Sequence, residues 1–325
     1  MFSDEGINAV AADLWPDSLT KLFHRGAIPF GRRLFAKYLA PAFAAQALSS
    51  LSRGDIAWIL GPAVPRRPYP REETQLKKRG IRYIFHIMDD WFNTPFLREA
   101  TLERGQLADL IVVPTPDLLH KVSSELPGIR VACLEEPVDT DRIQPVRSAS
   151  MDCAPTIVWT GNAANTRFLG VVAPVLGELY KKHAFKLRII SGRKPEFHFG
   201  CPSEWLPYNY TAESQLLEDA LIGLSPLEDT TYNRSKGIFK VKTYMAAGIA
   251  VVGSDVGYQK HLVTQGSTGF LCRTQDDWLK YLTALLQEPE RARAMGRRAR
   301  EEALRRFSHA AVSDQWVMAV KDFVC

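Results

Sequence analysis

The chain has 325 residues, of which 46% are apolar and 24% are charged, and its formal net charge is +5. This balance is typical of a globular protein with two domains of about 150 residues each, and no apolar run reaches the ~20 residues that cross a membrane. The N-terminal residues lack the features of a signal peptide, and the five cysteines form no CxxC pair. We therefore expect a cytoplasmic protein, with peripheral association at the inner face of the membrane as an open alternative.

Part of the positive charge is concentrated in one stretch of the first half. It comprises Arg66, Arg67, Arg71, Lys77, Lys78 and Arg79. A solvated basic loop and helix explains this stretch, and a surface for anionic lipid headgroups or a phosphorylated acceptor is the alternative. Because aromatic residues are not interleaved with these charges, we expect no nucleic-acid partner.

Short apolar runs alternate with amphipathic stretches along the chain. The expected strands are Asp55–Leu60, Ile81–Ile87, Leu110–Val113, Thr156–Trp159, Leu187–Ile190, Ala220–Leu224, Ile249–Val252 and Gly269–Leu271. The expected helices are Phe168–His183, Ser214–Ala220, Phe239–Ala247, Asp277–Leu286 and Glu288–Phe307. Strands that alternate with helices predict βαβ units, so we expect an α/β fold of two doubly wound Rossmann-like domains.

A stretch rich in proline and polar residues separates the two halves. Glu136–Pro145 holds two prolines, and the polar Arg147–Asp152 follows it. We place the domain boundary near residue 150, which gives an N-terminal domain at 1–150 and a C-terminal domain at 151–308. A last helix at 309–325 is expected to pack back toward the N-terminal domain. Ligands are expected in a cleft between the domains, at the carboxyl ends of the strands.

The segment Asn233–Gly248 has the features of a phosphate-binding element. Gly237 lets the backbone approach a ligand, and the helix expected after it offers free N–H groups and a positive dipole end. Lys236 and Lys240 are four residues apart, so a helix that starts early enough places both ammonium groups on one face. A surface helix with solvated lysines is the alternative that the spacing alone leaves open.

Five sequence elements follow one another from this segment to Ser308. They are a helix ending in MAAG, a VVxSxVG strand and turn, a GxxGFL strand, an EPE…MG helix and the tripeptide RFS. In this order they resemble the C-terminal domain of glycosyltransferase family 4, and Ile157–Phe168 resembles the first strand and loop of that domain. The resemblance implies a GT-B fold with two domains facing across a cleft, a nucleotide-sugar donor, and retention of anomeric configuration.

Two positions depart from the family pattern. Many members carry two glutamates eight positions apart, and the matching residues here are Ser235 and Thr243, which are uncharged. Lys240 and Tyr244 match a lysine-bearing subset of the family. The resemblance therefore implies that lysines, rather than glutamates, carry the charge at the donor site. The candidate donor-binding residues are Gly161, Asn162, Arg193, Lys194, Pro226, Asp229, Tyr232, Asn233, Ser235, Gly237, Ile238 and Thr243.

The acceptor side is expected after the strand that begins at Ile81. Asp89 and Asp90 are candidates to orient an acceptor hydroxyl, with His86, Trp91 and Thr115 beside them; a helix N-cap with a first-turn acid is the alternative. No third ligand is spaced for a metal, so we expect no metal and no cofactor other than the nucleotide-diphosphate sugar as substrate. In the expected mechanism, Lys236 and Lys240 stabilise the leaving diphosphate, which takes the acceptor proton.

The N-terminus is short for this family. Gly6–Asp13 resembles a later strand of the N-terminal domain, so the first βα unit is expected to be missing, which exposes a sheet edge and favours self-association. The predicted function is a retaining glycosyltransferase acting on a cell-envelope glycan or lipid-linked saccharide. A non-catalytic binding subunit and a sugar-nucleotide isomerase, with His261 as its candidate histidine, stay open as alternatives.

Overall fold

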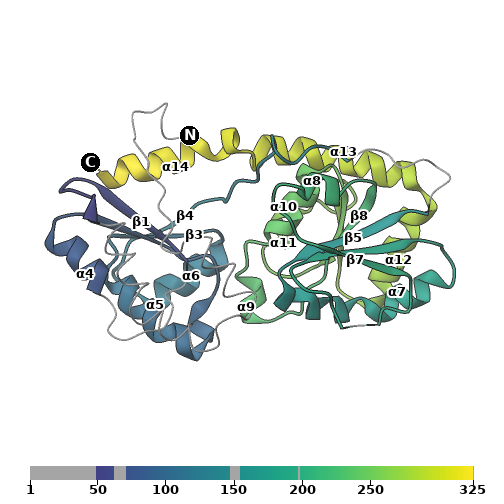
Figure 1. Cartoon of the computed structure of the whole chain (residues 1–325), viewed down its shortest axis with the longest axis horizontal. Coiled ribbons are helices and arrows are strands. Elements are labelled where there is room, and N and C mark those ends of the chain that lie inside the picture. Colours follow the sequence, from purple (N-terminus) through teal and green to yellow (C-terminus); the bar gives the residue numbers. More distant parts are fainter. Residues whose placement is uncertain (1–48, 62–70, 147–153, 197, 325) are drawn as a thin grey trace. The chain divides into compact units, whose positions relative to one another are not determined.

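The computed structural model describes residues 49–61, 71–146, 154–196 and 198–324 (Figure 1). The described residues divide into two compact units, one formed by those up to Leu134 together with 316–324 and the other by those from Glu135 to Gln315. Gly6–Asp13, Arg66 and Arg67 lie outside the described residues. Within the described ranges, no helix has both the length and the apolar character that crossing a membrane requires.

The first unit is built on a four-stranded parallel sheet. Its strands, in spatial order, are β1 (Ile56–Leu60), β2 (Arg82–His86), β3 (Leu110–Val113) and β4 (Val131–Cys133). Its helices are α4 (Arg71–Lys78), η3 (Trp91–Asn93), α5 (Pro95–Leu107) and α6 (Pro116–Glu125). The three strands expected from the sequence are confirmed. Strand β4 was not expected from the sequence, because it has three residues, is not fully buried and carries no hydrophobic alternation.

The second unit is built on a six-stranded parallel sheet. Its strands are β5 (Thr156–Gly161), β6 (Lys186–Ser191), β7 (Ser203–Pro207), β8 (Ala220–Ser225), β9 (Ala250–Ser254) and β10 (Gly269–Cys272). Their spatial order is β10-β9-β8-β5-β6-β7. The expected strands are confirmed, and the edge strand β7 was missed because its sequence, SEWLP, is half polar and ends in proline.

Helices cover both faces of this second sheet. They are η4 (Ala163–Val171), α7 (Ala173–Tyr180), α8 (Glu213–Leu216), α9 (Thr231–Arg234), α10 (Phe239–Ala246), α11 (Gln259–Leu262), α12 (Gln275–Gln287) and α13 (Pro289–Arg306). Side chains of α7 and α12 pack on one face, and those of α10 pack on the other. The single helix expected at Phe168–His183 is two elements, because a 3-10 segment ends at Val171 and Pro174 opens a new helix.

The order of strands in the second sheet creates a switch point at its centre. From β5 the chain proceeds outward through β6 and β7, and from β8 it proceeds outward in the opposite direction through β9 and β10. Pairing between β5 and β8 is last seen at Val158 opposite Gly223. Pairing of β5 with β6 continues to Gly161, and pairing of β8 with β9 continues to Ser225. The two central strands therefore diverge at their carboxyl ends, where ligands bind in open parallel sheets.

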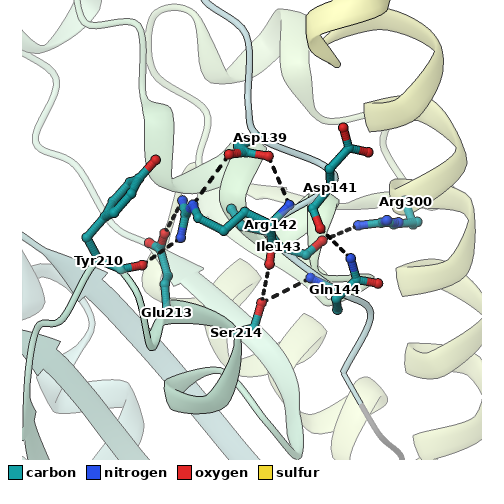
Figure 2. Close-up of polar contacts among 9 residues, drawn as sticks. All are labelled: Asp139, Asp141, Arg142, Ile143, Gln144, Tyr210, Glu213, Ser214 and Arg300. Atoms are coloured by element: carbon teal, nitrogen blue, oxygen red, sulfur yellow. Dashed lines mark hydrogen bonds and ion pairs between the residues drawn. The ribbon is translucent and has the colours of Figure 1, made fainter.

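The segment after Leu134 belongs to the second unit, so the boundary lies earlier than residue 150. The Val138 N–H donates to the Phe307 carbonyl at 2.7 Å. Arg142 bonds the Glu213 carboxylate and the Tyr210 carbonyl, and Arg300 donates to the Ile143 carbonyl (Figure 2). Arg300 also donates to the Thr140 carbonyl. Polar residues and prolines predicted a free linker, but these hydrogen bonds fasten the segment to the second sheet's helices.

A buried ion pair completes this fastening. Lys242 of α10 is fully buried, and its ammonium bonds the Glu135 carboxylate and, at 2.9 Å, the Glu136 carbonyl. The Tyr258 hydroxyl donates to the same carboxylate. A buried charge requires such partners, since unpaired it would cost several kcal/mol.

The last helix, α14 (His309–Val324), enters the first unit at Trp316. The Trp316 ring stacks on Trp58 with ring centroids 5.2 Å apart, and Arg82 donates to the Phe323 carbonyl. These contacts hold the end of the chain against the first sheet.

Replacing Lys242 with methionine should lower the free energy of unfolding by about 3 kcal/mol, because Glu135 then loses the ammonium that balances its charge. The double variant Lys242→Met/Glu135→Leu should recover part of the loss, since no uncompensated carboxylate remains. Urea unfolding followed by tryptophan fluorescence measures both effects. Lys260→Met is the control, because this lysine is exposed and lies 3.8 Å from Asp255; an equal loss in the control would contradict the role of burial.

Candidate functional site

The diverging ends of β5 and β8, from Trp159 to Gly161 and from Leu224 to Ser225, form a fork. Tyr244 of α10 lies in it, fully buried. Its hydroxyl accepts a hydrogen bond from the Thr160 N–H at 2.8 Å and donates to the Leu224 carbonyl at 3.2 Å. Burial raises the pKa of Tyr244, so the hydroxyl stays protonated and can donate.

Lys240 lies at the mouth of the fork. Its Nζ is 4.0 Å from the centroid of the Trp159 ring. A Cβ on Gly161 would lie 3.0 Å from this Nζ and 2.9 Å from the Trp159 ring, so the absence of a side chain at Gly161 makes room for both. Among the described residues, no carboxylate forms an ion pair with Lys240 within 4 Å. Its charge therefore faces an aromatic ring, which attracts a cation without neutralising it.

Lys236 is near enough for its charge to act on Lys240, and Arg167 approaches an aromatic ring that Lys236 also approaches. The Nζ of Lys236 is 4.9 Å from the centroid of Phe168 and 4.7 Å from that of Tyr232. The Cζ of Arg167 is 4.9 Å from the same Phe168 centroid. We call Arg167, Lys236 and Lys240 the cation cluster. Such a cluster on aromatic supports is a concentrated positive surface suited to a polyanion.

The electrostatic environment perturbs Lys240. Burial, and to a smaller extent the charge of Lys236, lowers the pKa of Lys240 from 10.5 to about 7. At neutral pH the ammonium is therefore only partly protonated, and a bound anion would favour its charged form. Such perturbed groups are concentrated at functional sites.

The loop before α10 has a strained backbone. Ile238 is the N-terminal flanking residue of α10, with φ of 50° and ψ of 50°, and no side chain caps the helix. A β-branched residue rarely adopts this left-handed conformation, and strain of this kind is typical of functional sites. Ile238 is buried in the core beside Val241, whose packing offsets the strain. The uncapped first turn leaves helix N–H groups available to a ligand.

The structure brings only some predicted donor residues together at the fork. Gly161 lies beside Lys240 there, Lys236 lies over the Tyr232 ring, and Gly237 and Ile238 are in the loop before α10. Sequence reasoning missed Arg167, Trp159 and Phe168 as supports of the site. The signal that could have found them is the cation and aromatic pair, Arg167 and Phe168, directly after a strand and its loop.

Other predicted donor residues have structural partners. Ser235 donates to the Thr231 carbonyl at 3.2 Å, and Asn233 donates to the Glu228 carbonyl at 2.9 Å; both are buried. Asn162 caps η4, accepting from the Ala164 N–H. The remaining positions are as follows: Asp229 is exposed and pairs with Arg234, Pro226 and Thr243 are buried, and Arg193 and Lys194 are exposed after β6.

The predicted acceptor residues lie in the first unit, and four of the five are buried. Asp90 is fully buried and accepts from the Asn93 side chain, without capping η3. Trp91 packs on Phe85, and Thr115 caps α6 by accepting from a backbone N–H. Asp89 is half-buried beside Asp90.

His86 lies in an aromatic cluster of the first unit. Its ring centroid is 6.1 Å from Trp58 and 5.8 Å from Trp316. Burial lowers the pKa of His86 to about 4, so the imidazole is neutral at pH 7. Across the described part of both units, no group of three or more histidine, cysteine, aspartate or glutamate side chains could hold a metal ion.

Comparison with known proteins identifies relatives of this arrangement. Residues 243–302 match the family model described as glycosyl transferases group 1. The chain is 30% identical over 129 residues to GDP-Man:Man(3)GlcNAc(2)-PP-Dol alpha-1,2-mannosyltransferase of Dictyostelium discoideum, covering 40% of this chain and 23% of that protein. It is 24% identical over 265 residues to trehalose synthase of Pyrococcus horikoshii, covering 75% and 57%. Among solved structures, HepE of Anabaena in complex with UDP-glucose superposes with a TM-score of 0.68 at 12% identity, covering 95% and 90%.

These similarities define the class of the protein. Its two parallel-sheet α/β units have the fold of the GT-B glycosyltransferases. The part of the chain that matches the glycosyl transferases group 1 model begins at Thr243 in α10 and ends in α13. The chain spans about a quarter of the mannosyltransferase and just over half of the trehalose synthase that it matches.

Replacing Lys240 with methionine should stabilise the protein at pH 7. The pKa of Lys240 is about 7 in the folded state and 10.5 as its ordinary value, so the unfolded chain binds more protons between these values. The loss of folding stability caused by burying the charged Lys240 is fully present below pH 7 and disappears as pH rises toward 10.5. The stability gap between variant and wild type should therefore shrink from pH 7 to pH 10 in urea unfolding. A gap that widens with pH would contradict the burial of this ammonium; Lys280→Met, at an exposed lysine over Tyr281, is the control.

Proposed function

We propose that the chain is a glycosyltransferase that moves a sugar from a nucleotide-diphosphate sugar to a hydroxyl acceptor, with the donor diphosphate bound at the cation cluster. The observation that carries this proposal is Lys240, which lies at the mouth of the fork over Trp159 with no carboxylate partner among the described residues. The family match over 243–302 and the GT-B fold support it.

The charges at the fork suit a diphosphate. Lys236 and Arg167 add to the charge of Lys240, and the uncapped first turn of α10 adds helix N–H groups and the positive end of the helix dipole. Gly161 permits close approach, because a side chain there would occupy the space beside the Lys240 ammonium. The fork is also the switch point of an open parallel sheet, where nucleotides bind.

The chemistry asked of these residues is stabilisation of a leaving group. As the bond between the sugar carbon and the phosphate oxygen breaks, negative charge grows on the diphosphate, and the cation cluster stabilises it. The acceptor oxygen forms the new bond to the same carbon, and its proton passes to the departing phosphate oxygen. Retention of configuration follows when attack and departure share one face of the sugar. Of the pair Asp89 and Asp90, the half-buried Asp89 is proposed to orient the acceptor hydroxyl. The proposed acceptor class is a cell-envelope glycan or a lipid-linked saccharide.

The two positions without glutamates fit this assignment. Ser235 and Thr243 are buried, and Ser235 is bonded to the Thr231 carbonyl. They cannot supply charge to a sugar hydroxyl, so positive charge at the diphosphate carries more of the binding. The isomerase alternative has less support, because His261 lies exposed on α11 with its ring 5.3 Å from Tyr258.

Lys240→Ala should lower the turnover of the preferred donor by about a hundredfold, or roughly 3 kcal/mol, because one charged contact to the leaving group is lost. UDP-glucose and GDP-mannose are the first donors to assay, by release of the nucleoside diphosphate. Lys280→Ala is the matched control, since that lysine also lies over an aromatic ring but on α12. Near-wild-type turnover of Lys240→Ala would overturn the assignment, and absence of both donor binding and turnover in the wild type would favour a non-catalytic subunit.

Binding of a nucleoside diphosphate should take up protons near neutral pH. The bound anion raises the pKa of Lys240 from about 7, so the complex holds more protons than the free protein above pH 7. The affinity for UDP or GDP should therefore fall, and the dissociation constant rise, as pH increases from 7 to 9. Isothermal titration in buffers of different ionisation enthalpy measures the uptake, which Lys240→Met should abolish. Proton uptake that persists in this variant would assign the titration to another group.

A further inference from the structure

The fork is held open by a single hydroxyl group. In the register that pairs Val158 with Gly223, Thr160 would lie opposite Ser225. The next hydrogen bond of a parallel ladder would then run from the Thr160 N–H to the Leu224 carbonyl. Instead, both groups bond the Tyr244 hydroxyl, at 2.8 and 3.2 Å. The phenol oxygen therefore occupies the position of a missing rung between the two strands.

The sequence makes room for this insertion. A Cβ on Gly223 would lie 2.5 Å from the Tyr244 ring, so only glycine at this position of β8 allows the ring to lie against the strand. Pro226, the residue after β8, has no N–H and cannot extend the ladder toward β5. Gly223 and Pro226 in and after β8, and Tyr244 in α10, thus all favour an end of the β5–β8 pairing at the same place.

The same helix face carries the base and the mouth of the fork. Tyr244 follows Lys240 by four residues in α10, so the two side chains project from the same side of the helix. Tyr244 packs in the core with Val158, whereas Trp159 packs in the core on the opposite face of the sheet. The Lys240 ammonium still reaches the Trp159 ring, at 4.0 Å. It must therefore extend past the separated strand ends, which is possible only while the strands stay apart.

We infer that Tyr244 is a positioning residue for the donor diphosphate: its hydroxyl separates β5 from β8 and thereby sets the place where Gly161, Trp159 and Lys240 meet the ligand. This inference rests on the proposed function of the site. A phenylalanine at this position keeps the ring in the core but removes the oxygen. Thr160 and Leu224 then either bond each other directly, which narrows the fork, or stay unpaired, which destabilises it. Either result moves Gly161 relative to Lys240.

The test compares Tyr244→Phe with the control Tyr281→Phe. In the wild type, the Tyr281 hydroxyl accepts from the Gln265 side chain at 3.1 Å on an exposed surface. Isothermal titration of the full chain uses UDP and GDP as diphosphate probes, and uridine and guanosine as probes without phosphate. Tyr244→Phe should weaken binding of the preferred diphosphate about tenfold, which equals about 1.4 kcal/mol, while nucleoside binding changes less than twofold. Tyr281→Phe should leave both affinities unchanged. A loss of general structure would instead weaken both kinds of probe.

A second variant guards against a folding defect. Gly223→Ala keeps the Tyr244 hydroxyl but pushes its ring, so it should reproduce the selective loss of diphosphate binding. If both variants still bind UDP or GDP and keep the wild type's ratio of diphosphate affinity to nucleoside affinity, the inference about Tyr244 is overturned, and the proposed function is not. Failure of the wild type to bind UDP and GDP would overturn the proposed function and the inference with it.

Discussion

The separation of β5 from β8 at their carboxyl ends is the constraint on which the rest of the second unit's site depends. Parallel strands continue pairing unless something satisfies their backbone groups in another way, because an unpaired buried N–H or carbonyl is costly. Here the Tyr244 hydroxyl satisfies one N–H and one carbonyl at once. The separated ends leave space for Lys240 to reach Trp159 above them. Chain topology places the fork at the centre of the sheet, and one phenol oxygen keeps it open.

The placement of positive charge at this fork is costly to the folded protein and useful to a ligand. Burial and the neighbouring Lys236 disfavour the charged form of Lys240, so its pKa falls to about 7. Aromatic rings compensate in part, since their faces attract cations without neutralising them. A polyanion that enters the site relieves the repulsion among these cations. Under the proposed function, a diphosphate bound at these cations would offset their mutual repulsion, which would be a compromise between stability and function.

Much of the fold could be predicted from patterns within single segments. The buried strands Leu110–Val113 and Ile249–Val252 are continuous apolar runs, and helices alternate with them, so parallel sheets follow directly. Elements without such patterns were missed: β4 is three residues long, and β7 is a half-polar edge strand. The boundary was expected near residue 150 because proline and polar residues suggest a free linker. Hydrogen bonds from Arg142 to Glu213 and from Arg300 to Ile143, between residues far apart in sequence, fasten that segment instead (Figure 2).

The sequence by itself determined the α/β class, the resemblance to group 1 glycosyltransferases and the two lysines proposed for the donor site, because these depend on local periodicity, motif order and residue type. Only the tertiary structure decided which side chains share the fork. It joined Lys240 to Trp159 and Gly161, 81 and 79 residues earlier, and added Arg167. It also gave Ser235 a backbone partner and enclosed Lys242 with Glu135. The physical reason is that burial, pairing and pKa depend on which groups folding brings within a few ångströms, and spacing along a chain does not encode that.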